Sequence, residues 1–159
     1  MDCKELFTRY WEKEGPATRK VISRIPEGSD YRPDPKARTA REIAWLMTQE
    51  EAALVDGLEK AAFTWVEAPC PAKIAEILAQ YDKQHDTLTK RLHLIPASRW
   101  EEQIPFLMDG KEVMREMGND WAWGFLHDEI HHRGQLSTYL RPMGAKVPAI
   151  YGASGDEQA

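Results

Sequence analysis

The chain has 159 residues, of which 42% are hydrophobic and 30% are charged, with a formal net charge of −5. That length suits one folded domain with a substantial core, and that composition excludes a disordered chain. The acidic balance and the lack of a Lys/Arg cluster argue against nucleic acid as a partner, because neutralising phosphates needs a basic patch. No apolar run approaches the roughly 20 residues of a membrane span, so no membrane partner is expected.

The two cysteines, Cys3 and Cys70, lie far apart and form no CxxC pattern. The sequence therefore supports neither a zinc knuckle nor a redox dithiol. A bystander role for Cys70 is favoured over a reactive thiol. Residues 1–5 lack the apolar core of a signal peptide, which makes a reducing cytoplasm the expected location.

Proline and glycine divide the chain into four long helical stretches. The first is predicted over residues 4–25. Gly15-Pro16 lies inside it and is expected to kink or split it, because proline lacks a backbone donor and clashes with the preceding turn. A proline-rich loop at residues 26–36 follows.

The second predicted helix, residues 39–60, begins with the pattern of a capping box, Thr39 followed by Glu42. Residues 61–70 form a connector. Pro71 suits the first position of the third helix, where a missing N–H costs nothing.

The third helix is predicted to end near Leu94. Residues 97–116 are mixed in character, show no β alternation of useful length, and are expected to be anchored to the bundle by Trp100, Ile104, Phe106 and Leu107. The fourth helix covers residues 119–143, with Gly144 as its C-terminal cap. Residues 146–159 are expected to be an extended tail that frays at its end. The pattern predicts an all-α protein, a four-helix bundle in one domain over 1–159.

At about 100° per residue, one arc of the fourth helix collects its large apolar side chains. These are Trp121, Phe125, Leu136, Tyr139 and Met143. Asp128 and His132 fall in the same arc, one turn apart. His127 points away from it and His131 lies on its shoulder. The inward pair is therefore predicted to be Asp128 and His132 rather than the two histidines of the HxxxH pattern.

The other helices also carry ionisable groups inside their apolar arcs: Glu14 in the first, Glu50 in the second and His85 in the third. Each lies near the middle of its helix, so all could meet at one height of the bundle. An unpaired buried carboxylate costs several kcal/mol, so this pattern needs a cause.

Two explanations stay open. One is a divalent metal at the bundle centre, since facing Glu, Asp and His side chains build such sites. The other is a network of salt bridges, such as His85 with Glu14 or Asp128 with His132. For a single residue the network is favoured; for Asp128, His132 and Glu50 together, contact with a metal or substrate is favoured. Arg133 and Gln135 are expected on a solvated or subunit-facing edge.

Two segments resemble a known family. Residues 131–141, His-His-Arg-Gly-Gln-Leu-Ser-Thr-Tyr-Leu-Arg, followed by Gly144 and by Val-Pro-Ala-Ile-Tyr-Gly at 147–152, resemble the C-terminal signature of the DinB-like, or damage-inducible, superfamily. Residues 38–45 are similar to that family's second-helix entry. The resemblance implies a bundle of up-down-down-up order, usually a homodimer, that holds a divalent metal, often nickel or zinc, with three histidines.

The chain departs from that histidine pattern at two positions. Leu46 stands where the family's second-helix histidine would fall, and Asp128 replaces the first histidine of the fourth helix. Only His132 matches by type, while Glu50 could substitute one turn beyond Leu46. We expect a metal site that is weakened or lost, and a His-Asp-Glu set that suits manganese or iron better than zinc or nickel.

The resemblance implies two candidate functions. The first is a metal-dependent enzyme, a hydrolase or S-transferase acting on a small polar or thiol-containing substrate, with the metal held by His132, Asp128 and Glu50. His131 would orient the site or act as general base, and His85 would be a second proton acceptor. The second is a metal-free, non-catalytic dimeric module for binding or stress response.

Overall fold

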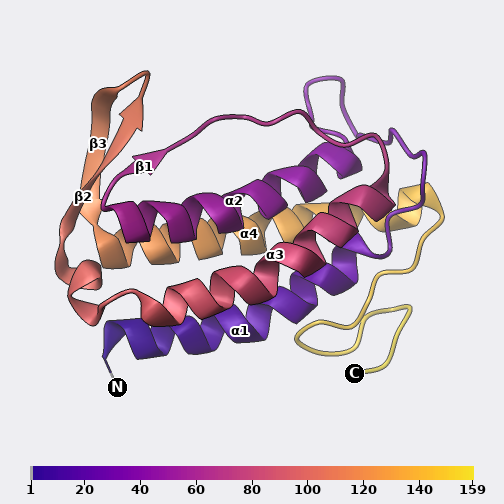
Figure 1. Ribbon diagram of the computed structural model, residues 1–159. Coiled ribbons are helices and arrows are strands. Elements are labelled where there is room, and N and C mark those ends of the chain that lie inside the picture. Colours follow the sequence, from indigo (N-terminus) through magenta and orange to yellow (C-terminus); the bar gives the residue numbers. More distant parts are fainter. Residues whose placement is uncertain (1) are drawn as a thin grey trace.

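The computed structural model describes residues 2–159 and shows four long helices packed side by side (Figure 1). They are α1 (Cys3–Ile22), α2 (Ala40–Lys60), α3 (Ile74–Leu94) and α4 (Gly118–Leu140). In Figure 1, α1 and α4 run in one direction and α2 and α3 in the other, an up-down-down-up order. The long connector between α2 and α3 follows from this order, because two parallel neighbours cannot be joined by a tight turn.

The prediction of an all-α protein is wrong, because a three-stranded sheet sits at one end of the bundle. Its strands are β1 (Phe63–Thr64), β2 (Gln103–Met108) and β3 (Lys111–Met117), in the order β1-β2-β3. β1 pairs parallel to β2, and β2 pairs antiparallel to β3. The hairpin of β2 and β3 rises from the end of the bundle where α4 begins (Figure 1).

The hairpin escaped detection because almost all of β3 is exposed to solvent, so it carries no apolar alternation. Its turn did leave a local signal. Asp109-Gly110 occupies the tip, and both residues have positive φ, 50° and 74°. Asp-Gly between two short extended runs is the sequence that such a hairpin turn prefers.

Several helix boundaries differ from the predicted ones: α1 ends at Ile22 rather than residue 25, and α4 ends at Leu140 rather than residue 143. α1 is a single helix through Pro16, so Gly15-Pro16 does not split it. α3 begins at Ile74 rather than Pro71, where the Glu27 carboxylate accepts hydrogen bonds from the backbone N–H groups of Ile74 and Ala75. Glu27 thus supplies from another segment the acceptor that a helix start requires.

Other local predictions are confirmed. The capping box of Thr39 and Glu42 is formed at the start of α2, with the hydroxyl of Thr39 accepting from the N–H of Glu42. α4 is followed by a short 3₁₀ turn, η2 (Arg141–Met143), which Gly144 caps with a φ of 79°. A second 3₁₀ turn, η1 (Ala97–Glu101), leads from α3 toward the hairpin and buries Trp100.

The apolar core consists of two clusters, one toward each end of the bundle. The cluster at the hairpin end includes Phe7, Trp11, Leu54, Leu58, Leu88, Leu92, Trp100 and Leu126. The cluster at the opposite end includes Val21, Ile22, Ile43, Met47, Ile77, Tyr81, Leu136 and Leu140. Between them lie buried polar side chains from the middle of each helix, among them Glu14, Glu51, Glu129 and Arg133.

The C-terminal tail contains no helix or strand after η2, yet polar contacts tie it to the bundle. Glu157 forms ion pairs with Lys20 at 2.7 Å and with Arg24 at 2.8 Å, both on the α1 side. Asp156 pairs with Arg141 at 3.0 Å. These ion pairs hold the tail, which the sequence predicts to fray, against the bundle.

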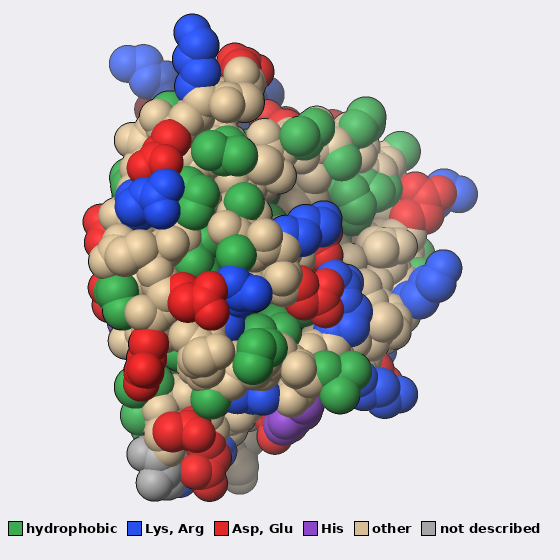
Figure 2. Space-filling view, turned by 60° about the vertical axis from the view of Figure 1, so that its left-hand side comes forward, with side chains coloured by type: hydrophobic (Ala, Val, Ile, Leu, Met, Phe, Trp, Pro, Cys, Tyr) green, Lys and Arg blue, Asp and Glu red, His purple; other side chains and the backbone are tan. Residues whose placement is uncertain are grey.

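No helix among residues 2–159 is long and apolar enough to cross a membrane. On the face seen in Figure 2, where the hairpin end comes forward, acidic and basic side chains are intermixed with apolar ones. That face shows no basic field of the kind that binds a phosphate backbone.

Candidate metal centre

Glu50 of α2 and Asp128 and His132 of α4 come together at the edge of the bundle. Each offers one ligand atom, and these atoms all lie within 4.8 Å of one another. Nε2 of His132 is 3.5 Å from Oδ2 of Asp128 and 3.8 Å from Oε1 of Glu50. One helical turn separates Asp128 from His132, and α2 packs beside α4, so the geometry follows from two neighbouring helices.

The charges of this cluster are poorly compensated. Glu50 is buried, and its Oε2 has no hydrogen-bond partner. Burial, followed by the negative charge of Asp128, raises the pKa of Glu50 to about 9. A buried oxygen without a donor is costly, and a cation bound between the carboxylates would satisfy it.

Two hollows lie on the helices that carry the cluster, and of these only the one on α4 has a cluster residue in its lining. One, of about 390 Å³, is lined by Leu46 and Gln49 of α2 together with Arg38, Glu67 and Cys70. The other, of about 510 Å³, lies along the outer face of α4. It is lined by Trp121, Gly124, Phe125, His127, Asp128 and His131. Asp128 therefore belongs both to the cluster and to this second hollow, so the cluster can be reached from solvent.

Comparison with known proteins identifies the family. The sequence profile of the DinB family matches residues 1–159. This chain is a member of the DinB family. It is 25% identical over 161 residues to the uncharacterized protein YrdA of Bacillus subtilis, a match that spans 96% of this chain and 90% of that protein.

Solved structures of DinB-like proteins share the fold. The chain resembles one from Bacillus cereus with a TM-score of 0.75 and 18% identity, over 92% of this chain and 97% of that one. It resembles the DinB-like protein YjoA of Bacillus subtilis with a TM-score of 0.71 and 14% identity, over 89% and 94% of the two chains. The resemblance stated from sequence is thus confirmed at the level of family and fold.

In this DinB-family protein, the two replaced ligand positions lie at the cluster or beside it. Leu46 is only 8% exposed and lines the hollow next to Glu50, one turn away. Asp128 takes the family's histidine position and is itself part of the cluster. The cluster therefore offers two carboxylates and one imidazole, with Glu50 one turn from Leu46, the position at which the resemblance implies a histidine.

The bundle of this DinB-family protein also contains a buried polar layer, which we define as Glu14, Thr18, Glu51, Tyr81, His85, Glu129 and Arg133. Arg133 donates from Nη2 to Oε2 of Glu14 at 2.6 Å, and it also contacts the hydroxyl of Tyr151 from the tail. Thr18 donates to Oε1 of Glu129 at 2.5 Å. Burial, followed by the charge of Glu51, raises the pKa of Glu129. Hydrogen bonds link the members of this layer, and Oε2 of Glu51 is its one buried side-chain oxygen without a partner.

His85 belongs to the buried polar layer and not to the cluster. Its Nδ1 lies 2.7 Å from Oε1 of Glu51, which also accepts from the hydroxyl of Tyr81 at 2.9 Å. The imidazole stacks between the rings of Trp11 and Tyr81, each 5.5 Å away. A Cβ on Gly15 would lie 2.2 Å from Nε2 of His85, so only glycine lets α1 approach this ring.

The predicted inward face of α4 needs correction. The side chain of Asp128 is 53% exposed, whereas Arg133, expected on a solvated or subunit-facing edge, is 2% exposed. The residues of α4 that are buried are Gly118, Ala122, Leu126, Glu129, Arg133, Leu136, Tyr139 and Leu140. Trp121 and Phe125 misled the prediction because both rings pack sideways against Phe63 of β1, outside the bundle centre.

Glu129 and Arg133 are both buried on α4, and the sequence interpretation missed this for both residues. The available signal was Leu126, Leu136 and Leu140, whose positions share one face with them at helical spacing. His127 and His131 are both exposed at the rim of the hollow on α4. The wheel pointed His127 away from the core and put His131 on the shoulder of the inward arc.

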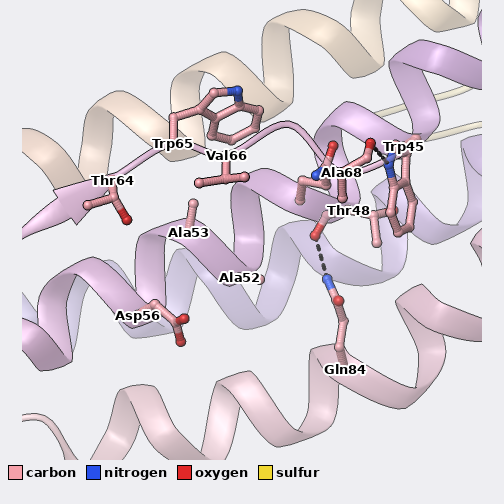
Figure 3. A pocket seen from close by; sticks show the side chains of 11 residues that line it. Trp45, Thr48, Ala52, Ala53, Asp56, Thr64, Trp65, Val66, Ala68 and Gln84 are labelled. Atoms are coloured by element: carbon pink, nitrogen blue, oxygen red, sulfur yellow. Dashed lines mark hydrogen bonds between the residues drawn. The ribbon is translucent and has the colours of Figure 1, made fainter. Parts of the chain in front are cut away.

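A further cavity of about 320 Å³ lies between α2 and the connector that passes over it (Figure 3). Ala52 and Ala53 of α2 face Thr64 and Val66 of the connector, and Gln84 of α3 donates to the backbone oxygen of Thr48. None of the three cluster residues lines it. The cluster is therefore reached through the hollow along α4, whose lining includes Asp128.

Proposed function

We propose that this DinB-family protein is a divalent-metal-dependent enzyme that acts on a small polar or thiol-containing substrate, as a hydrolase or S-transferase. The observation that carries the proposal is the convergence of Glu50, Asp128 and His132 within 4.8 Å, with a buried carboxylate oxygen left without a partner. Oε2 of Glu51 in the buried polar layer also lacks a hydrogen-bond partner, so the unpartnered oxygen alone does not mark a metal site. What distinguishes Glu50 is that a second carboxylate and an imidazole lie beside it, as in sites that hold a divalent ion.

The donor set fits a divalent ion with open coordination positions. Two carboxylates and one imidazole would hold the ion from one side, and the exposure of Asp128 leaves the other side to substrate. Oxygen-rich sets favour manganese or iron over the nickel or zinc preferred by nitrogen and sulfur ligands. A bound ion would polarise a substrate oxygen or lower the pKa of a thiol.

Two histidines, His131 and His85, are the candidates for proton transfer. His131 sits exposed beside Asp128 at the rim of the hollow on α4, where it can accept a proton from a substrate bound there. His85 was a second candidate for proton transfer from sequence, but its Nδ1 is bonded to Glu51 inside the buried polar layer. We therefore propose His131 as the proton acceptor and a structural role for His85. The homodimer, the cytoplasmic location and a role in stress response stay predictions.

The experiment compares metal binding in two variants of untagged protein, His132→Ala and His127→Ala. We expect His132→Ala to weaken manganese or iron(II) binding by at least about tenfold, because the loss of even an outer partner of a metal ligand costs 10–100-fold. His127→Ala should bind like the parent, since His127 is not part of the cluster. The measurement is isothermal titration calorimetry, with elemental analysis of the purified protein.

The outcomes separate the two functions proposed from sequence. Equal metal affinity in both variants would place the metal elsewhere. A parent protein that binds none of manganese, iron, nickel and zinc would support the alternative. In that alternative the protein is a metal-free binding module that lost its site when Leu46 replaced a ligand.

A further inference from the structure

The hollow along the outer face of α4, which we call the α4 hollow, adjoins the cluster through a shared residue. Its volume is about 510 Å³, and its lining residues come from Trp121 to His131 of one helix. Asp128 forms its boundary with Glu50 and His132. A molecule that occupies the hollow would therefore lie beside the ligand atoms of the cluster.

Contacts with β1 and β2 fix the two large apolar side chains that line the α4 hollow, Trp121 and Phe125. The ring of Phe63 lies 5.0 Å from that of Trp121 and 5.4 Å from that of Phe125. Nε1 of Trp121 donates to the backbone oxygen of Ile104 at 2.9 Å, which fixes the indole against the hairpin. An aromatic surface that is ordered before binding loses little entropy when a ligand packs on it.

Gly124 lines the α4 hollow and leaves the space above it free of side chain. A Cβ built at this position would meet nothing within 4 Å, so neither packing nor a close backbone approach requires glycine here. Glycine in a helix interior costs about 1 kcal/mol relative to alanine. Gly134, on the same helix, is equally free of neighbours but does not line the hollow.

We propose that the α4 hollow receives a ring-sized apolar group of the substrate, with Gly124 as the residue that admits it, while a donor atom of the same molecule reaches the cluster. This substrate class rests on the proposed metal-dependent function. The volume of the hollow lies in the range of about 300–1,000 Å³ typical of small-molecule sites, and Asp128 joins it to the ligand atoms of the cluster. A small molecule is therefore the occupant that fits.

The test compares two probes that carry the same metal-binding group, benzohydroxamate and acetohydroxamate, on manganese-loaded protein. We expect the parent to bind benzohydroxamate at least about tenfold more tightly, because the ring is taken out of water. Gly124→Leu should abolish this preference and leave the affinities for manganese and acetohydroxamate unchanged. Gly134→Leu is the matched control and should keep the preference.

A preference that is absent in the parent, or that survives Gly124→Leu, would overturn the proposal. If no variant binds metal, the proposed function fails, and the hollow is tested separately with 2-naphthol on metal-free protein by amide NMR. Shifts at residues 121–131 that Gly124→Leu removes and Gly134→Leu keeps would support the hollow; their absence would refute it. Sedimentation in which Gly124→Leu alone dissociates a dimer would show that a second copy is the occupant and would also refute it.

Discussion

The cluster and the buried polar layer both place carboxylates of α2 and α4 near a histidine, but they differ in how closely their charges are paired. In the layer, Arg133 pairs with Glu14 at 2.6 Å and His85 with Glu51 at 2.7 Å. In the cluster, the one imidazole, His132, lies 3.5 Å or more from either carboxylate. One buried oxygen lacks a hydrogen-bond partner in each group, Oε2 of Glu51 in the layer and Oε2 of Glu50 in the cluster, so the contrast rests on the ion pairs. Paired groups inside a bundle indicate structure, whereas unpaired groups at an accessible edge indicate binding.

The contrast is clearest between neighbours in sequence. Glu50 and Glu51 are both buried, yet Glu50 faces the cluster and Glu51 faces Tyr81 and His85. On α4, Asp128 and Glu129 divide in the same way, one exposed at the cluster and one buried beside Thr18. One step of about 100° along a helix thus separates a candidate ligand from a structural carboxylate.

The largest effect is expected when the buried polar layer loses its only guanidinium. Arg133→Met should lower the free energy of unfolding by about 3–5 kcal/mol, because the buried Glu14 then loses its cationic partner and keeps only the hydrogen bond from the hydroxyl of Tyr151. Urea denaturation measures the change. Arg141→Met, which removes an exposed pair with Asp156, is the control and should cost no more than about 1 kcal/mol. Equal stabilities for the two variants would mean that the layer does not depend on this pair.

The next effect adds a ligand to the cluster. Without metal, Leu46→His should be less stable than the parent. Leu46 is only 8% exposed, so the substitution buries a polar ring that has no partner. Nickel or zinc should restore its stability, since a ligand that binds only the folded state stabilises it. Thermal melts with and without metal check this. An identical response to metal in variant and parent would show that Leu46 is core only.

The smallest expected effect is the pH dependence of the stability that His85 contributes to the buried polar layer. Burial lowers the pKa of His85, but the hydrogen bond and charge of Glu51, with those of Glu129 and Asp86, outweigh it and raise the pKa above 6.5. The charged imidazole therefore stabilises the fold fully below pH 6.5, and this contribution is lost as pH rises through the folded-state pKa.

Urea denaturation at several pH values tests this dependence. His85→Gln, which keeps an amide donor near Glu51, should lose more stability relative to the parent at pH 6 than at pH 9. His93→Gln is the matched control on α3, because His93 pairs with Glu12 at an exposed position. A stability difference for His85→Gln that does not change with pH would mean that His85 is neutral in the fold.

The sequence alone determined the helices and the family. Proline and glycine positions, the capping box of Thr39 and Glu42, and apolar spacing are local signals, so they gave α2 within a residue and the middle of each other helix. The sequence also selected Glu50, Asp128 and His132. Asp128 and His132 are one turn apart on one helix, which fixes their spacing, and Glu50 lies in the apolar arc of the second helix. The same signals placed Glu14 on the buried face of α1.

Only the tertiary structure decided the hairpin, the orientation of α4 and the division between cluster and layer. The aromatic rings of Trp121 and Phe125 carry the same apolar signal whether they face the bundle centre or the strand that holds Phe63. A helical wheel shows which residues share a face but does not show what that face contacts. Whether a carboxylate finds a partner depends on side chains far away in sequence, as Arg133 and Glu14 show across 119 positions.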